Sequence, residues 1–222
     1  MRSTRPDIAV AVSVLSRFLD RPTMLHSDMV KRVYRYLMAN FRFGLHFKPT
    51  KDDLTLVGYS DASYGNSYES RSMSGYALML SGSLVSWYAR TQPVVALSTA
   101  EGEYIAFTDI TKEQVWMKLF MSELGYAQGS VTILEDNQAA IRIAKNPQDN
   151  KRTKHIQGPY HYVRDHVRDG VVTLKYIPTI DQLADIFTKA LNGPRLRDLR
   201  SRLGITKVPA SVGELDMSLL SI

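Results

Sequence analysis

The sequence contains no cysteine and no apolar run long enough to cross a bilayer. Without cysteine the chain can form neither a disulfide framework nor a thiolate metal site, which favours an intracellular protein. Any metal ion must then be held by oxygen or imidazole ligands. A membrane helix would need about 20 consecutive apolar residues, and the first ten residues, MRSTRPDIAV, lack the apolar stretch of a secretory signal.

The composition is that of an ordinary globular chain, with 44% hydrophobic and 23% charged residues among 222. This length can bury a core as one large domain or as one domain with a smaller appendage. The net charge of +6 and the isoelectric point of about 9.4 favour a polyanionic partner. Charge alone is a weak signal, because many basic proteins bind no nucleic acid.

Hydrophobic spacing predicts the order of helices and strands. Apolar residues at helical spacing predict two helices in residues 1–50, one after Pro6 and one from Pro22 to Gly44. Short β-forming runs separated by turn residues then predict three antiparallel strands, over 54–61, 74–81 and 84–90. The rest of the chain predicts helices over 99–124, 137–146, 160–169, 180–191 and 194–204, and strands over 130–136 and 171–178.

This order predicts a mixed α/β fold with one five-stranded sheet, in which three antiparallel strands are followed by two parallel ones and helices flank the sheet. We expect a helical segment over 1–50, the sheet domain over 51–193, and a C-terminal helix and tail over 194–222. A crossover after the three-stranded meander would place the first and fourth strands side by side. Asp61 and Asp136, at the ends of these two strands, would then emerge at the same edge.

Two carboxylates at neighbouring strand ends repel each other, and the sequence offers neither of them an obvious fixed cation. A divalent ion would neutralise them. Mg²⁺ suits such a site, because it prefers hard oxygen ligands and keeps water molecules that a substrate can replace. Two ions a few ångströms apart can activate a water and stabilise the leaving oxygen of a phosphodiester.

Four motifs occur in an order that resembles a known family: GYSDAS, STAEGEY, EDNQA and QLADIFTKAL. They resemble the RNase H domain of Ty1/copia-type retrotransposon Pol polyproteins. The N-terminal stretches TRPDIAVAVSVLSRF and VKRVYRYL resemble the connection segment before that domain, so the resemblance covers residues 4 to about 205. It implies an RNase H-like fold and an endoribonuclease that hydrolyses the RNA strand of RNA–DNA hybrids during reverse transcription. The implied cofactors are two Mg²⁺ ions, with Mn²⁺ as the substitute.

The resemblance also implies the catalytic and metal-binding residues, which are Asp61, Asp136, Asp185 and a glutamate of STAEGEY. Ser98 and Glu101 have the spacing of a capping box, which gives Glu101 a structural role at the start of the helix. We therefore assign Glu103 to the metal site. The opposite helix phase would place Glu101 there instead. For Asp185 alone, an exposed helical carboxylate is the alternative.

The substrate contacts that we expect are Ser63, Asn137, Gln138, Arg90, Lys154 and His155. Contact with the 2′-hydroxyl distinguishes RNA from DNA, and amide side chains after Asp136 could supply it. Asn137 has an alternative role as a helix cap, His155 as a structural histidine, and the cations as solvated surface residues. Many RNases H carry a histidine in the loop before the last helix, whereas this chain has YIPTIDQ there.

Two rival functions remain open at this point. One is a non-catalytic RNase H-fold module that binds nucleic acid or docks a partner, and the other is a structure-selective nuclease. The implied partners are an RNA–DNA hybrid and the polymerase portion of the same polyprotein, with no membrane. We expect the chain in the cytoplasm or a virus-like particle, with the nucleus as the alternative.

Overall fold

Five strands form the central sheet of the chain. The computed structural model describes residues 4–47, 54–65, 70–146 and 157–208. The strands lie in the order β4–β3–β2–β5–β6 across the sheet. Their bounds in that order are Ser83–Thr91, Met73–Leu80, Leu56–Ser63, Val131–Glu135 and Val172–Tyr176.

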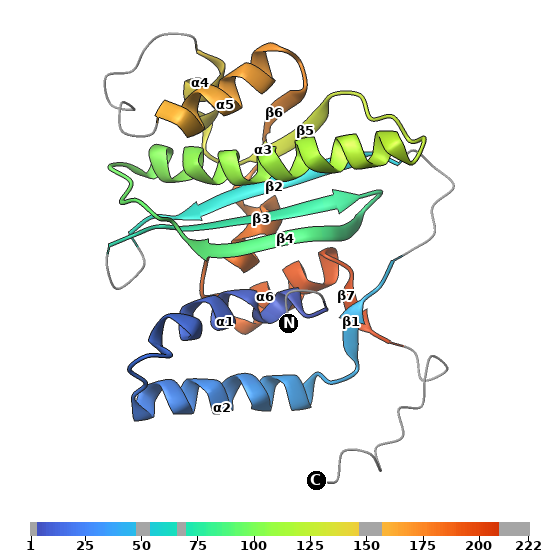
Figure 1. Ribbon diagram of the computed structural model, residues 1–222. Helices are drawn as coiled ribbons and strands as arrows, with labels where there is room; N and C mark the ends of the chain where they lie inside the picture. The colour runs from blue at the N-terminus through green and yellow to red at the C-terminus, as the bar shows by residue number, and fades with distance from the viewer. Residues whose placement is uncertain (1–3, 48–53, 66–69, 147–156, 209–222) are drawn as a thin grey trace.

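The sheet has the mixed topology that the sequence predicts. β2 pairs antiparallel with β3, and β3 pairs antiparallel with β4, while β2–β5 and β5–β6 are parallel. The predicted RNase H-like sheet, with three antiparallel strands followed by two parallel ones, is therefore confirmed. Because β2 and β5 run side by side in the same direction, both end at the same edge of the sheet (Figure 1).

Helices cover both faces of the sheet (Figure 1). The long helix α3, Thr99–Glu123, packs on one face with α4, Gln138–Lys145, and α5, Gln157–Arg168. Buried apolar residues of α3 and of the strands form the larger core there, including Leu56, Leu78, Phe107, Ile110 and Ile133. The other face carries α1, Ala9–Leu15, and α6, Gly193–Arg202, over a second core that includes Met79, Leu84, Phe187, Leu199 and Ile205.

The N-terminal segment contains a strand that the sequence analysis did not predict. β1, Phe43–Leu45, pairs antiparallel with β7, Ile205–Lys207, in a separate two-stranded sheet. Gly44 therefore lies within a strand, and the prediction that it ends the second helix was wrong. Three-residue strands are too short to show an alternating pattern, and here the partner lies far along the chain. The preceding elements are the 3₁₀ turns Pro6–Ile8 and Ser16–Phe18, helix α1, and helix α2, Met24–Ala39.

A polar network joins this N-terminal segment to α6. Arg5 forms an ion pair of 2.8 Å with Asp7, and the Tyr36 hydroxyl donates to Asp7 at 2.7 Å. Arg200 of α6 donates to the Tyr36 oxygen at 3.1 Å and lies 3.9 Å from the ring centroid of Phe43. These contacts hold the N-terminal segment against α6. In the described part of the chain, none of the helices is long and apolar enough to cross a membrane.

The helix predicted over 180–191 is wrong. Two 3₁₀ turns occupy this region instead, Thr179–Asp181 and Leu183–Phe187. Gln182 lies between them with extended backbone angles. Its buried side chain donates to the Ser60 carbonyl at 2.7 Å and accepts from the Ala184 amide at 3.2 Å. A tertiary hydrogen bond to β2 thus replaces the backbone bonds that would have continued a helix.

Gly75 lets the second 3₁₀ turn approach the sheet beside the end of β2. It pairs directly with Asp61 across the β2–β3 ladder. A methyl group at Gly75 would lie 2.7 Å from Phe187 Cβ and 2.6 Å from Thr188 Cγ2. No real contact is that short, so a side chain at Gly75 would push the 187–188 segment away from Asp61.

Gly75→Ala is therefore expected to destabilise the fold by about 1–3 kcal/mol, the usual cost of overpacking. Urea unfolding followed by circular dichroism measures this change. Gly129→Ala is the matched control, because a methyl group there meets no atom within 4 Å. Equal stabilities of the two variants would contradict the close approach at Gly75.

Candidate functional site

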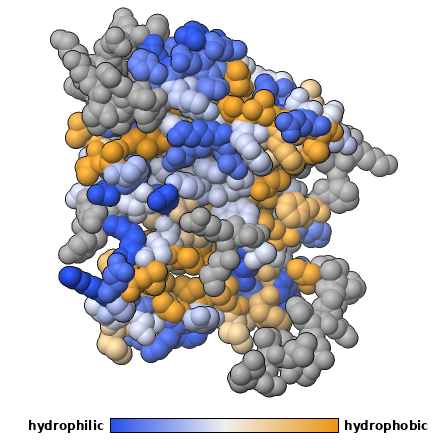
Figure 2. Space-filling view, in the orientation of Figure 1, coloured by the Kyte–Doolittle hydropathy of each residue, from blue (hydrophilic) through white to orange (hydrophobic). Residues whose placement is uncertain are grey.

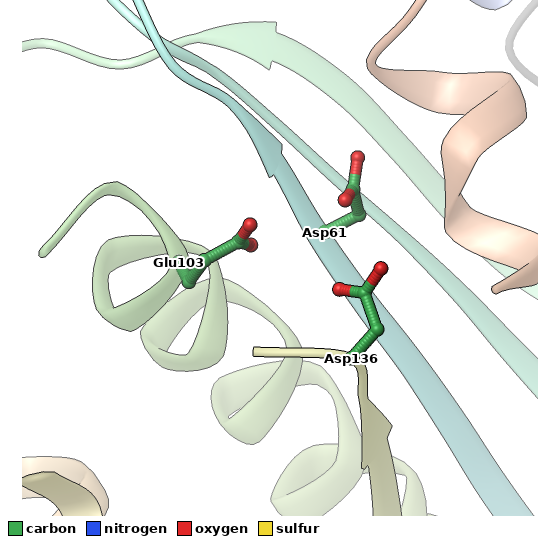
Figure 3. Close-up of side chains that lie close together, drawn as sticks. All are labelled: Asp61, Glu103 and Asp136. Atoms are coloured by element: carbon green, nitrogen blue, oxygen red, sulfur yellow. The ribbon is translucent and has the colours of Figure 1, made fainter. Parts of the chain in front are cut away.

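Three carboxylates meet at the edge of the sheet where β2 and β5 end. Asp61 lies in β2, Asp136 directly follows β5, and Glu103 lies in the second turn of α3. Each offers one oxygen, and these oxygens all lie within 4.8 Å of one another (Figure 3). The parallel pairing of β2 with β5 brings the aspartates together, and α3 adds the glutamate as it crosses the sheet. We call these residues the carboxylate trio.

The carboxylate trio concentrates negative charge in a largely buried place. Asp61 is 1% exposed and Glu103 is 4% exposed. Burial raises the pKa of Glu103 well above its ordinary value, and the charges of Asp61 and Asp136 raise it further. The backbone amide of Ala62 donates a hydrogen bond to this carboxylate, whereas its buried Oε2 has no protein partner among the described residues. An orphaned buried oxygen beside two more carboxylates suits a bound cation.

Lys189 supplies a fixed cation that the sequence analysis missed. Its ammonium lies 3.0 Å from Asp61 Oδ1 and 2.6 Å from Asp185 Oδ1. Burial raises the pKa of Asp61, while the charge of Lys189 opposes that shift. Burial lowers the pKa of Lys189, yet the two aspartates together raise it above its ordinary value. The expectation that Asp61 lacks an evident cation was therefore wrong.

Asp185 lies beside the trio and is joined to it through Lys189. Its second oxygen, Oδ2, accepts from Arg195 at 3.2 Å, so both oxygens of Asp185 contact cations. Arg195 also donates to the carbonyls of Thr179 and Ile180, which holds the 3₁₀ segment in place. Asp185 is 5% exposed, so the alternative of an exposed helical carboxylate does not describe it.

Glu101 has the capping role that its spacing indicated. Its amide donates to the Ser98 hydroxyl at 3.3 Å, and its carboxylate accepts from the Leu97 amide at 2.9 Å. The carboxylate thus reaches the residue before the cap rather than the cap itself. Glu103, two residues further along α3, points into the trio (Figure 3).

The expected substrate contacts lie in different surroundings. Ser63 is buried at the end of β2, and Arg90 is exposed on β4. Asn137 caps α4, accepting from the amides of Ala139 at 3.0 Å and Ala140 at 3.1 Å. Gln138 is exposed beside the trio, whereas Lys154 and His155 fall outside the described residues.

Glu135 is a buried carboxyl that the sequence analysis did not single out. It is fully buried at the end of β5, and its Oε1 accepts from the Asn137 amide at 3.0 Å. Burial raises the pKa of Glu135 well above its ordinary value, and the charge of Glu103 raises it further. One feature of the sequence indicated that Glu135 is buried, which is its position before Asp136. Neighbouring side chains of a strand point in opposite directions, so Glu135 points away from the side to which Asp136 points.

The stability of the metal-free chain is therefore expected to fall as the pH rises. The native Glu135 carboxyl keeps its proton to a higher pH than it does in the unfolded chain. Between the unfolded pKa of 4.5 and the raised native pKa, the folded state therefore binds more protons, and stability falls with pH across that window. Glu135→Gln is expected to gain about 1–3 kcal/mol over the wild type at pH 8, and less at pH 5. Urea unfolding in EDTA at both values measures this, with exposed Glu123→Gln as the control. Parallel pH profiles of the wild type and Glu135→Gln would contradict the assignment.

Two adjoining cavities lead from the trio along α4. The first, of about 420 Å³, is lined by Glu103, Asp136, Gln138 and Tyr176 among others. The second, of about 470 Å³, shares Gln138 and Tyr176 with it. Its lining includes three exposed cations, Arg142, Lys145 and Lys175. We call the two cavities together the α4 groove.

The trio and its surroundings define the chain as an RNase H-like α/β protein with a carboxylate site suited to a divalent cation. No family model matches the chain. Over 192 residues it is 42% identical to the retrovirus-related Pol polyprotein from transposon TNT 1-94 of Nicotiana tabacum, which covers 86% of this chain and 14% of that protein. Over 210 residues it is 35% identical to the retrovirus-related Pol polyprotein from transposon RE1 of Arabidopsis thaliana. That match covers 94% of this chain and 14% of the RE1 polyprotein.

The chain therefore belongs to the same family as one segment of these Ty1/copia-type Pol polyproteins. It spans about 14% of the length of these curated relatives. Among solved structures it is similar to the N-terminal RNase H domain of rv2228c from Mycobacterium tuberculosis. That match has a TM-score of 0.46 and 10% identity, and covers 67% of this chain and 98% of the other.

Proposed function

We propose that the chain is a metal-dependent ribonuclease H that cuts the RNA strand of RNA–DNA hybrids. The observation that carries the proposal is the convergence of Asp61, Glu103 and Asp136 from three separate elements within 4.8 Å. Homology to Pol polyproteins supports the same class of reaction, because reverse transcription leaves RNA paired with DNA. The proposal also includes the partners of the chain, which are the RNA–DNA hybrid and the polymerase portion of a polyprotein.

The carboxylates have the ligand chemistry of a magnesium site. All donors are hard oxygens, and one of them, Glu103 Oε2, has no hydrogen-bond partner among the residues that the structure describes. Asp61, Glu103 and Asp136 would hold the first of two Mg²⁺ ions, and Asp61 with Asp185 the second. Bound ions would activate a water and stabilise the leaving oxygen of the phosphodiester. Mn²⁺ would substitute, because it accepts the same ligands.

The chain's own residues would hold the hybrid beside these ions. Asn137 is the N-cap of α4, and Asn137 and Gln138 both line the cavity next to the trio. Ser63 lies on β2 and Arg90 lies on β4, with β3 between these two strands. We propose contacts to sugar hydroxyls for the two amides and contacts to phosphates for Ser63, Arg90 and Lys154, with His155 as a further substrate contact.

The α4 groove is the path that we propose for one strand away from the cut. Arg142 and Lys145 follow Gln138 along α4 at spacings of four and three, so the three lie on one helix face. At about 1.5 Å per residue, the distance from Gln138 to Lys145 is about 10 Å. Along a duplex axis, where each strand carries one phosphate per about 3.4 Å, this length corresponds to about three nucleotides. Hydrophilic side chains gather at the end of the molecule that carries α4 and α5 (Figure 2).

A panel of labelled substrates tests the proposed function. A 5′-labelled RNA–DNA hybrid, a duplex RNA and a duplex DNA are each incubated with the chain and Mg²⁺. Cleavage of the RNA in the hybrid alone is the expected result. Equal cutting of duplex RNA would favour a structure-selective nuclease. Binding without cutting under all conditions would favour the non-catalytic module.

Removing the three groove cations is expected to weaken hybrid binding and its salt dependence. Each cation that neutralises a phosphate contributes about one unit to the slope of log affinity against log salt. The glutamine variant of all three should therefore have a slope smaller by about 2–3 units. Fluorescence anisotropy in EDTA, where no cutting occurs, measures it. The residues replaced are Arg142, Lys145 and Lys175.

A second triple variant controls for net charge in this measurement. Three exposed cations of α2 are replaced by glutamine, which changes the net charge equally at the opposite end of the molecule from α4 (Figure 1). Binding close to that of the wild type is expected from this control. Equal losses in both variants would contradict a path along the α4 groove. The control residues are Lys31, Arg32 and Arg35.

A further inference from the structure

We propose that Lys189 is the resident cation of one half of the site, and that its ammonium occupies the space between Asp61 and Asp185 that a second divalent ion would take. The inference rests on the proposed function, because it concerns the same carboxylates. In the absence of nucleic acid, the chain would then hold one divalent ion, at the carboxylate trio. A second ion would have to displace Lys189.

The geometry places one positive charge between two buried carboxylates. The Lys189 nitrogen lies within 3.0 Å of an oxygen of each aspartate. The side chains of Asp61 and Asp185 are 1% and 7% exposed, so water offers them little compensation. Ligand oxygens around Mg²⁺ lie about 2.0–2.1 Å from the ion, so ion and ammonium cannot share this position.

Neighbouring groups strengthen this arrangement. The Thr188 hydroxyl donates to Asp61 Oδ2, the oxygen that Lys189 does not contact. Arg195 contacts Asp185 Oδ2 and thereby brings a second cation to the same aspartate. Asp185 thus has both of its oxygens next to positive charge, which lowers its attraction for a further ion.

At the half of the site formed by Glu103 and Asp136, no cation among the described residues neutralises the carboxylates. Among the described residues, neither Glu103 nor Asp136 forms an ion pair with a lysine, arginine or histidine, and Glu103 Oε2 accepts no hydrogen bond. The two halves share only Asp61. A divalent ion therefore gains more at the trio than between Asp61 and Asp185, where it must replace an ammonium already in contact with both.

The Lys189 ammonium can also move away from the two aspartates into solvent. Its side chain is 34% exposed, unlike the two carboxylates that it joins. A lysine has a flexible stem of four carbons, so the ammonium can move into solvent while the stem stays against the protein. Lys189 is in this sense a positioning residue, because it acts on the ion and not on the substrate.

Counting bound Mn²⁺ ions in the nucleic-acid-free chain tests this role. Isothermal titration of the wild type is expected to detect one tight Mn²⁺. Lys189→Met removes the charge and keeps most of the volume. It is expected to bind a second Mn²⁺ at least tenfold more tightly than the wild type does. Lys189→Arg keeps the charge and should bind one ion, as the wild type does.

Two further variants make the result specific. In the double variant Lys189→Met, Asp185→Asn the second ion should be lost again, because one of its ligands is gone. Lys189→Gln covers the case in which Lys189→Met does not fold. Thermal unfolding adds a readout apart from activity: in EDTA the uncharged variants should melt below the wild type, and Mn²⁺ should raise their Tm by more than it raises that of the wild type.

The outcomes separate this inference from the proposed function. Two Mn²⁺ ions of similar affinity in the wild type, or unchanged binding in Lys189→Met, would overturn the role of Lys189 alone. Absence of any Mn²⁺ binding in the wild type would overturn the metal site itself, and with it both proposals.

Discussion

Glu103→Gln is expected to lower the rate of hybrid cleavage about a thousandfold. The carboxylate points into the trio, and in the described part of the chain its Oε2 has no hydrogen-bond partner that could compensate for lost metal binding. Losing a metal ligand removes several kcal/mol of transition-state stabilisation. About 4 kcal/mol corresponds to a factor of a thousand, at 1.36 kcal/mol per tenfold. Single-turnover cleavage of a labelled hybrid in Mg²⁺ measures the change.

Glu101→Gln is the matched control, since it lies two residues earlier on the same helix. Its carboxylate accepts from the Leu97 amide, and a glutamine oxygen can accept the same bond. Cleavage within about threefold of the wild type is expected. A large loss in Glu101→Gln together with little loss in Glu103→Gln would reverse the two assignments and would place Glu101 in the site.

Removal of divalent ions is expected to abolish hybrid cleavage and to leave hybrid binding largely in place. Among the described residues, Lys189 is the only cation in contact with the trio, and it contacts only Asp61 of the three. The described part of the chain therefore offers no group that could replace a metal ion at Glu103 and Asp136. Binding depends on the exposed cations of the α4 groove, which do not require the ion.

Dialysis against EDTA, followed by parallel cleavage and anisotropy measurements, tests this separation. The cleavage rate should fall below detection, return with excess Mg²⁺, and return also with Mn²⁺. Binding should stay within about tenfold of the value with metal. Cleavage that persists at full rate in EDTA would contradict a metal-dependent reaction.

Much of the sheet could be predicted because its signals are local. β-forming runs bounded by turn residues mark the three antiparallel strands, and the handedness of crossovers limits where the fourth strand can pair. Asp61 lies near the end of β2 and Asp136 directly follows β5, so the parallel pairing of these strands brings the two residues together. The separate β1–β7 sheet was missed, because strands of three residues carry no periodic pattern.

The region after β6 shows where sequence periodicity fails. Residues 180–191 have the apolar spacing of a helix, yet Gln182 bonds to Ser60 of β2 and breaks it into two 3₁₀ turns. If residues 180–191 formed a helix, Asp185 and Lys189 would be four residues apart on its surface and would form an exposed ion pair. In the fold that pair is turned toward Asp61, 128 residues away from Lys189. No local pattern encodes such a contact.

The most direct test of the carboxylate trio is anomalous diffraction from crystals of the chain grown with Mn²⁺. An anomalous peak is expected with oxygens of Asp61, Glu103 and Asp136 as ligands, at about 2.1 Å as for Mg²⁺. A trio without a peak at saturating Mn²⁺, or a peak held by other residues, would contradict the metal role of these carboxylates.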